Sequence, residues 1–253
     1  MKAIIEYNSR KIAIDVSKPI DISIAIDATK ENVNAWYVDD PKIFPQKLEE
    51  DIIKVTEGAV VNFNNIHFNP HSHITHTECV GHITEEVHSV NQHLKHFFFV
   101  AEVVTVAPEV INGDFVISKK QLQTQIRNKK RDAIVIRTLP NLPDKKSKRY
   151  SNTNPTYLSE AAAIYLKENG IKHLLIDLPS VDKEKDGGQL LAHNAFWNTS
   201  GVLRMDATIT EFIYVPNAVV DGEYLLNLMI APFENDATPS KPILYKILVD
   251  EKK

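Results

Sequence analysis

The sequence predicts an α/β fold that is richer in strand than in helix and forms one domain over residues 1–253. Three observations support this prediction. Short runs rich in Ile and Val recur along the chain, and such runs are typical of strands. Residues 133–178 have strand, helix and strand patterns in that order, which indicates a right-handed crossover between parallel strands. With 253 residues, 43% of them hydrophobic, the chain can fill one large core.

The first third of the chain favours a β-meander followed by loops. A tight turn is expected at Asn8-Ser-Arg10, between the first two strands. Residues 34–44 contain Trp36 and Tyr37 beside two prolines, and we interpret this segment as a loop over a pocket. Alternating runs rich in Ile and Val predict strands at residues 3–6, 11–16, 21–26 and 60–68.

The centre of the chain alternates between strands and helices. The apolar run FFFVAEVVTV at residues 97–106 predicts a buried central strand. Residues 118–128 are polar with apolar side chains at helical spacing, which predicts a short surface helix. Residues 157–169 are strong helix formers, with Thr156 as the expected N-cap and Gly170 as the stop. The remaining strand predictions are residues 133–137, 172–178, 209–215, 224–230 and 243–249.

Charge and composition exclude several classes of partner. The net charge is −4 and the pI about 6.2, so no overall basic field attracts the protein to nucleic acid or to an anionic membrane. Charged residues interrupt every apolar run before it reaches the length of a membrane span. Cys79 is the only cysteine, which excludes an internal disulfide and suits a reducing compartment. Because the N-terminus also lacks the apolar core of a signal peptide, we expect a cytoplasmic protein.

The histidines give the main functional signal. Eight of the ten lie between His67 and His96, and the densest stretch, residues 69–82, is NPHSHITHTECVGH. In an extended segment alternate residues share a face, so His76 and Glu78 project to the same side. An imidazole nitrogen and a carboxylate oxygen form a donor set suited to Zn, Mn or Fe. The alternative is a polar loop with surplus histidines.

The same stretch resembles a known family. The segment His76-Thr-Glu-Cys-Val-Gly-His82, preceded by Thr75, resembles the signature His-x-Gly-Thr-His-x-Asp-x-Pro-x-His of the metal-dependent cyclase-like hydrolases. That family includes bacterial kynurenine formamidase (arylformamidase). Three further segments resemble the family in the same order along the chain: Ile20-Asp-Ile-Ser23, Asp186–His193 and Ile209-Thr-Glu211. The resemblance therefore spans nearly the whole chain.

The resemblance implies a fold, a metal and an activity. The implied fold is a strand-rich mixed-sheet core with flanking helices, of the swivelling β/β/α kind. Residue by residue, the family's metal ligands correspond to His76, Glu78, His193 and Glu211, and its acid/base histidine corresponds to His82. The implied cofactor is a divalent metal, zinc first and manganese second, with no other cofactor. The implied activity is hydrolysis of an amide, formamide or cyclic amide C–N bond in a small molecule by metal-activated water.

The signature departs from the family pattern at its first ligand. Ser72 stands where the family has a histidine, and His71 and His73 flank it. Glu78 keeps the carboxylate of the family's aspartate but has a reach longer by one methylene. We expect either His71 or His73 to turn toward the metal, or water to fill the position.

A second hypothesis belongs to a different class: a non-catalytic member of the same fold that binds a small ligand or a metal. Turnover that is lost on chelation and restored by Zn or Mn would favour the hydrolase. Cys79 could be a thiol nucleophile, but we favour a packed or pocket-lining thiol. The run Lys145–Arg149 is interpreted as a solvated loop. We also expect a homo-oligomer, dimeric or larger, because family members are typically oligomeric and residues 34–44 form a candidate arm toward a partner subunit.

Overall fold

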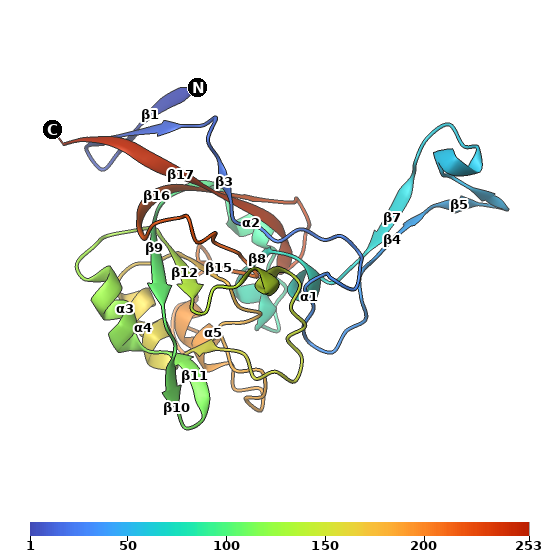
Figure 1. Ribbon diagram of the computed structural model, residues 1–253. Helices are drawn as coiled ribbons and strands as arrows, with labels where there is room; N and C mark the ends of the chain where they lie inside the picture. Colours follow the sequence, from blue (N-terminus) through green and yellow to red (C-terminus); the bar gives the residue numbers. More distant parts are fainter. Residues whose placement is uncertain (253) are drawn as a thin grey trace.

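The central element of the fold is a mixed sheet of ten strands (Figure 1). The computed structural model describes the backbone of residues 1–252 and the side chains of residues 1–248. The path through the sheet is β1-β2-β17-β16-β9-β12-β14-β15-β8, with β3 paired to β17. These strands are β1 (Lys2–Tyr7), β2 (Arg10–Asp15), β3 (Ile20–Asp21), β8 (His76–Glu78), β9 (Phe98–Val106), β12 (Ala133–Thr138), β14 (His173–Ile176), β15 (Thr208–Glu211), β16 (Gly222–Ile230) and β17 (Ala237–Lys252).

The short strand β8 closes part of this sheet into a ring. It pairs antiparallel with β15 on one side and with the first residues of β17 on the other. Seven strands, from β17 through β16, β9, β12, β14 and β15 to β8, therefore form a closed circuit of hydrogen-bonded neighbours. All three residues of β8 thus pair with strands that lie more than 130 positions away in the sequence.

Three helices cover the outside of the parallel part of the sheet. Strands β9, β12, β14 and β15 run parallel, and α3 (Lys119–Ile126), α4 (Glu160–Glu168) and α5 (Leu191–Trp197) pack on their outer face (Figure 1). The predicted succession of strand, helix and strand is confirmed by β12, α4 and β14. The mixed α/β architecture with more strand than helix is confirmed as well.

Alternate side chains of the central strands supply two apolar cores. On β12, Ile134 and Ile136 pack under the helices, whereas Ala133 and Val135 pack inside the ring of strands. Strands buried on both faces are continuous apolar runs in the sequence, which is why residues 97–106 and 133–137 were recognisable as central strands.

Several predicted boundaries were wrong. The predicted helix at 157–169 begins only at Glu160 with Ser159, not Thr156, as its N-cap. The cause is that β13 (Tyr157–Leu158) pairs with β11 (Asp114–Ile117), so these residues belong to a strand. Gly170 has φ 78° and ends the helix as predicted, because glycine adopts this left-handed conformation without steric cost.

The strands predicted at 21–26, 60–68 and 209–215 are shorter than expected. The first reduces to β3, the second to β7 (Asn64–His67), and the third to β15. The physical reason is clear for β15, since Phe212 has φ 53° and turns the chain out of the sheet directly after Glu211.

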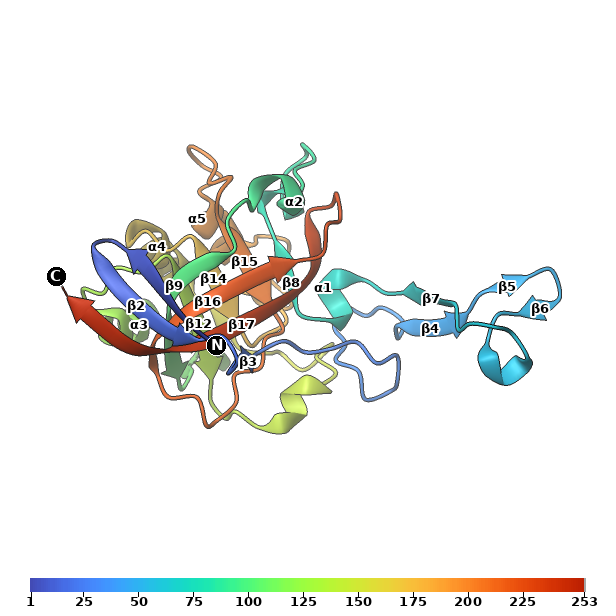
Figure 2. The ribbon, with the colours of Figure 1, turned by 90° about the horizontal axis from the view of Figure 1, so that it is seen from above.

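A two-stranded ribbon, residues 42–67, projects from the body of the molecule (Figure 2). It contains β4 (Lys42–Pro45) paired with β7, then β5 (Lys47–Leu48), β6 (Asp51–Ile52) and the 3-10 turn η1 (Val55–Glu57) near its tip. No residue of the ribbon is buried. Eight of the 24 exposed large apolar side chains found in the described residues lie here, a third of them in about a tenth of the chain.

The remaining short elements lie around the ring and the helices. They are α1 (Pro70–His73), η2 (Val80–His82), α2 (Val90–His93), β10 (Glu109–Ile111) and η3 (Pro143–Lys146). Among the described residues, no helix combines the length and the apolar character that a bilayer crossing requires.

Candidate metal centre

Strand β8 places two potential metal ligands inside the protein. His76 and Glu78 project to one side of the strand and are both fully buried. Thr77 projects to the other side, where its hydroxyl hydrogen-bonds Thr210 Oγ1 at 2.8 Å. The antiparallel register sets Glu211, the last residue of β15, directly opposite His76.

Three further histidines converge on these side chains from other elements. His71 on α1 lies with its Nδ1 3.1 Å from Glu78 Oε2. His193 on α5 lies with its Nε2 3.2 Å from Glu78 Oε1. His82 on η2 is more distant and half-buried, with its Nε2 3.9 Å from Glu78 Oε2. We call His71, His76, Glu78, His82, His193 and Glu211 the histidine cluster.

The spacing of the donor atoms suits a cation. His76 Nε2 lies 3.4 Å from Glu211 Oε2 and 3.9 Å from Glu78 Oε2. Ligands held about 2.1 Å from a tetrahedral ion are about 3.4 Å from one another, which matches these separations. His71, His76 and Glu78 offer donor atoms that all lie within 4.8 Å of each other, and so do Glu78, His82 and His193.

Two buried donor atoms strengthen the fit. His76 Nε2 and Glu78 Oε2 are buried without a hydrogen bond of good geometry among the described residues, although His71 Nδ1 lies 3.1 Å from Glu78 Oε2. A buried polar atom without a partner costs about 1–3 kcal/mol, and more when it is charged. Coordination of a divalent cation would satisfy both atoms, so the residues present fit a metal.

Within the cluster, His71, His76 and His193 each have their second ring nitrogen held by an acceptor. Outward from the cluster, His193 Nδ1 is 2.6 Å from Asp182 Oδ2 and His76 Nδ1 is 3.1 Å from the carbonyl of Ile74. His71 Nε2 is 2.9 Å from Asp236 Oδ2. Metal-binding histidines characteristically donate their other N–H in this way, which fixes the tautomer and the ring orientation.

Electrostatics in the cluster favour proton uptake in the absence of a cation. Burial by itself lowers the pKa of His193, but the hydrogen bonds with Asp182 and Glu78 outweigh it and raise that pKa to about 10. The pKa of His71 is likewise raised to about 10 against the effect of burial, by Asp236 and Glu78. Burial raises the pKa of Glu78, but the surrounding histidines hold it well below its usual range. Protons and a cation therefore compete for the same nitrogens.

Comparison with protein families and solved structures agrees with this geometry. The family model described as putative cyclase matches residues 14–183, two thirds of the chain. The chain belongs to this cyclase family. A comparison with curated protein sequences gives no match.

Solved structures with the same fold cover nearly the whole cyclase-family chain. A potential metal-dependent hydrolase with cyclase activity superposes with a TM-score of 0.65 at 16% identity, over 90% of this chain and 97% of its own. An isatin hydrolase bound to the product analogue thioisatinate gives 0.64 at 14% identity, over 91% and 93%. Isatin hydrolase A from Labrenzia aggregata gives 0.67 at 12% identity, over 91% and 94%. At these identities the likeness establishes the fold.

The two histidines that flank Ser72 differ in orientation in this cyclase-family chain. His71 faces the cluster, whereas His73 Nδ1 accepts a hydrogen bond from the backbone N–H of Asn69. Asn69 caps α1 by accepting from the N–H of His71, which fixes the start of this turn. Of the two histidines that flank Ser72, the structure brings His71 into the cluster and leaves His73 outside it.

Two carboxylates of the site have no signature in the sequence. Asp182 lies in the loop after β14 and accepts from the backbone N–H groups of Ala192 and His193 as well as facing the His193 ring. Asp236 lies immediately before β17 and contacts both His71 and His82. A search for a carboxylate partner of each ligand histidine could have proposed Asp182, but only the sheet pairing brings Asp236 to the site.

Cys79 is a packed thiol. Its side chain is fully buried, its Sγ donates to the carbonyl of His88 at 3.3 Å, and burial raises its pKa to about 11. A thiol with such a pKa is a poor nucleophile. The neighbouring Gly81 permits this packing, because a Cβ there would lie 2.3 Å from the carbonyl oxygen of His88.

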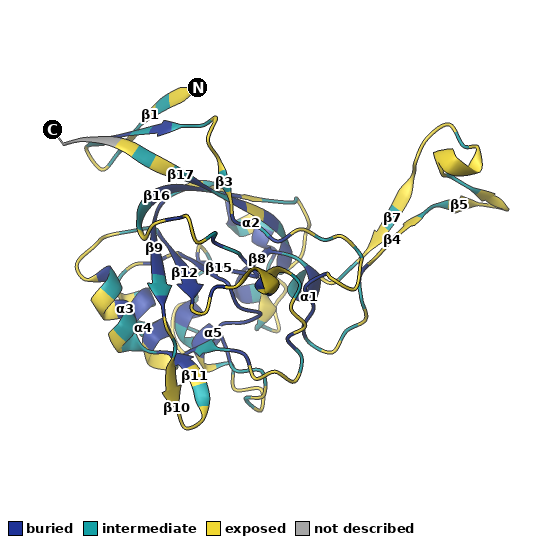
Figure 3. Cartoon of the chain, in the orientation of Figure 1, coloured by how far each residue is buried: buried dark blue, intermediate teal, exposed yellow. Residues whose placement is uncertain are grey.

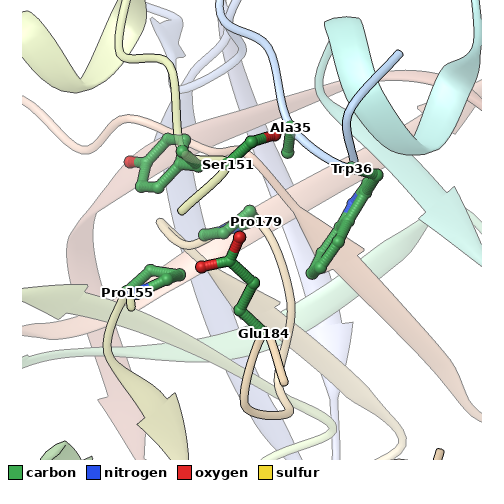
Figure 4. Close-up of a pocket in the computed structure, with 7 residues that line it drawn as sticks. Ala35, Trp36, Ser151, Pro155, Pro179 and Glu184 are labelled. Carbon is green, nitrogen blue, oxygen red and sulfur yellow. The ribbon is translucent and has the colours of Figure 1, made fainter. Parts of the chain in front are cut away.

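The aromatic segment 34–44 lies beside the centre and lines a narrow crevice that is too tight to hold a water-sized sphere (Figure 4). Trp36 forms one wall, and its Nε1 donates to the carbonyl of His71 at 3.1 Å, which ties this wall to α1. Pro155, Pro179 and Glu184 line the rest, with the Glu184 carboxylate directed into the space. Residues 34–41 form the expected loop, whereas residues 42–44 belong to β4, and Ala35 and Trp36 of the loop line the crevice.

The basic run at 145–149 is only partly solvated, which corrects the expectation of a solvated loop. Lys145 is buried, and its Nζ donates to Asp177 Oδ2 at 2.7 Å and to the carbonyl of Thr138 at 2.7 Å. Asp177 also accepts from the backbone N–H of Thr138. This ion pair joins η3 to the ends of β12 and β14 beside the site.

Proposed function

We propose that this cyclase-family protein is a metal-dependent hydrolase that cleaves a C–N bond of a small molecule. One observation carries the proposal: the buried His76 and His193 and the partly buried His71 present one ring nitrogen each to two buried carboxylates, while acceptors hold their other nitrogens. The hydrolase activities in the names of the structural neighbours support the reaction class. The proposed ligands are His76, Glu78, His193 and Glu211, as implied by the family signature, together with His71.

Zinc is the proposed cation, with manganese as the alternative. Three imidazole nitrogens with carboxylate oxygens form a borderline donor set that suits zinc, and the cluster contains no thiolate. When bound, such a cation supplies Lewis acidity, which polarises a carbonyl and makes water a stronger nucleophile near neutral pH.

His82 is the proposed acid/base. Its Nδ1 lies 3.2 Å from Asp236 Oδ2, so with the carboxylate as acceptor the proton sits on Nδ1 and Nε2 is left to accept one. Nε2 faces the side of the cluster where Glu78 lies, and the side chain is half-buried, so a substrate can reach it. Nε2 can take the proton that water releases as it attacks the carbonyl and then give this proton to the leaving nitrogen, as C–N cleavage requires.

A small planar substrate fits the surroundings best. Trp36, Tyr150 and two prolines form the walls of the pocket beside α1, and flat apolar walls favour a flat apolar ligand. The crevice as it stands has no room for a ligand, so Trp36 has to move to admit a substrate. Trp36 and Tyr37 both have positive φ, at 63° and 60°, and this strained backbone is a natural hinge.

The ribbon is the proposed contact to a second copy of the chain. Ile43 and Ile66 face each other across it and both are exposed. An apolar groove of about 460 Å³, lined among others by Ile24, Ile74 and Met229, lies on the body of the same molecule. In a two-fold dimer each ribbon can cover the groove of its partner, since such an interface uses the same two patches twice. The proposed arm is thus residues 42–67, which only overlaps the segment 34–44 expected from sequence.

A metal-loaded substrate screen tests the activity. Protein stripped by a chelator and reloaded with Zn or Mn would be assayed on N-formyl aromatic amines, lactams and cyclic imides. The hydrolase proposal expects turnover that disappears on chelation and returns with the metal. Saturable binding of such compounds without turnover under either metal would favour the non-catalytic alternative instead.

A further inference from the structure

We propose that Asp236 is a positioning residue that holds His71 and His82 with one carboxylate oxygen. This inference rests on the proposed metal centre and deepens it. Asp236 Oδ2 lies 2.9 Å from His71 Nε2 and 3.2 Å from His82 Nδ1. The two rings stack at 4.3 Å between centroids with an interplanar angle of 27°, so they form one unit on the same oxygen.

The backbone fixes Asp236 at this place. Its carbonyl accepts a hydrogen bond from the N–H of Cys79 at 3.0 Å, and the next residue, Ala237, pairs with Glu78 in the sheet. The carbonyl of Asn235 accepts from the N–H of Val90 at 2.9 Å. The start of β17 is therefore tied to the segment that carries Glu78 and His82, and the carboxylate is placed by the same ladder that places the ligands.

The contact with His71 explains how a histidine outside the family position can serve as a ligand. With Nε2–H donated to Asp236, the lone pair of His71 is on Nδ1, the atom that faces Glu78. His71 lies one residue before the usual ligand position, and it reaches the cluster through Nδ1. Asp236 selects that tautomer, because a carboxylate accepts hydrogen bonds and does not donate them when ionised.

The contact with His82 gives the same carboxylate a second role. It leaves His82 Nε2 as the free nitrogen, so the orientation of the acid/base is coupled to the orientation of a metal ligand. Asp182 and His193 form a similar pair on the opposite side of the cluster, but Asp182 serves one ring only. Asp236 is therefore the residue whose loss disturbs binding and proton transfer together.

The test compares Asp236→Asn and Asp236→Glu with the wild type, using zinc and cobalt(II) as probes. Outer carboxylates of ligand histidines typically contribute 10- to 100-fold to metal affinity. We expect the zinc dissociation constant of Asp236→Asn, measured by chelator competition, to rise roughly 10- to 100-fold, with the visible spectrum of the cobalt-loaded protein altered. Asp236→Glu keeps the charge and should recover part of the affinity. Glu234→Gln, two residues away and bonded to Asn91 and Gln92, is the matched control and should match the wild type.

A second measurement reads the tautomers directly. Nitrogen-15 NMR of the histidine rings in the zinc-loaded protein should show the proton of His71 on Nε2 and that of His82 on Nδ1, and Asp236→Asn should mix these states. Unchanged affinity, cobalt spectrum and tautomers in Asp236→Asn would overturn the inference. Loss of one of two bound ions in Asp236→Asn would also overturn it, because Asp236 would then be a ligand in a site with His71 and His82. A wild type that binds no metal would instead refute the proposed function itself.

Discussion

The histidine cluster and the ribbon break the usual distribution of side chains in opposite ways. The cluster places histidines and carboxylates in the interior, whereas the ribbon places apolar side chains in solvent. Figure 3 shows the ribbon, from β4 to β7, without buried residues along its length. Burial of ionisable groups costs free energy unless they are paired or coordinate a metal, and large exposed apolar patches are rare on monomers. Each region therefore points to a component outside the chain: a cation for the cluster and a second copy for the ribbon.

The two regions also differ in how firmly the fold holds them. Closure of the ring by β8 and the pairing with β15 and β17 fix the cluster from several sides. The ribbon is held by its own short ladder of four residue pairs. A change in the ribbon should consequently leave the body folded, whereas a change in the cluster should affect metal binding and stability together.

The largest expected effect is on catalysis by His82. His82→Ala should lower turnover on any substrate found by about two to four orders of magnitude, because it removes the proton-transfer group while leaving the buried ligands in place. Bound metal and the melting temperature should stay close to wild type. If the metal is lost together with activity, His82 is a ligand and the acid/base must be sought elsewhere.

The next prediction concerns the ribbon. Ile43→Lys combined with Ile66→Asp replaces an exposed apolar cross-strand pair by an opposite-charge pair, so the ribbon can stay paired while its apolar surface is lost. The dissociation constant of the dimer should rise roughly 100-fold, the effect expected when a central interface contact is lost. Analytical ultracentrifugation at several concentrations would measure this shift.

The matched control for the ribbon is Val202→Asp. Val202 is 86% exposed but lies in the loop after α5, outside the ribbon. It should leave the association state unchanged. A wild type that is monomeric at micromolar concentration, or a double variant that dimerises as well as the wild type, would remove the proposed role of the ribbon.

A smaller effect distinguishes clustered from isolated buried histidines. His173 is buried, its Nδ1 lies 2.9 Å from Thr208 Oγ1, and burial lowers its pKa to about 3. The unfolded chain takes up a proton near pH 6.5 and the folded protein does not, so stability falls as pH drops below 6.5. His71 and His193, with pKa values of about 10, stay protonated in the folded state, and the unfolded state becomes fully protonated only as pH drops below 6.5. Their small contribution therefore has the opposite sign, and it cancels when the wild type is compared with a His173 variant.

Between pH 6.5 and pH 5 the contribution of His173 amounts to roughly 2 kcal/mol. Denaturant unfolding of the metal-free protein at the two pH values would measure it, with His173→Gln as the comparison. The variant should lose about 2 kcal/mol less than the wild type over this range. Equal losses in both proteins would show that His173 is not kept neutral by burial.

The sequence predicted those parts of the fold whose signals are local. The apolar runs at β9 and β12 are buried strands, and the helical spacing at 118–128 is α3, in which the structure adds a capping box of Ser118 and Gln121. The shortened strands and the late start of α4 depend on partners far away in the chain, such as the pairing of β13 with β11. The pattern of residues within one segment carries no information about such distant pairings.

The site shows the same division. His76, Glu78 and His82 stand in one short segment, so their proximity follows from spacing, and the family resemblance added His193 and Glu211. The choice between His71 and His73 depends on the turn capped by Asn69, and the position of Asp236 depends on the register between β17 and β8. These contacts arise only when the ring of strands closes.

The central claim is that the buried histidine cluster holds a divalent cation. Metal analysis of wild type, His76→Ala and His193→Ala, purified without chelator, tests it most directly. At least one divalent transition ion per wild-type chain is expected, most of it lost in both variants, together with a melting temperature lowered to that of the chelated wild type. A wild type that takes up no ion even after addition of zinc, or full occupancy in both variants, would contradict the claim.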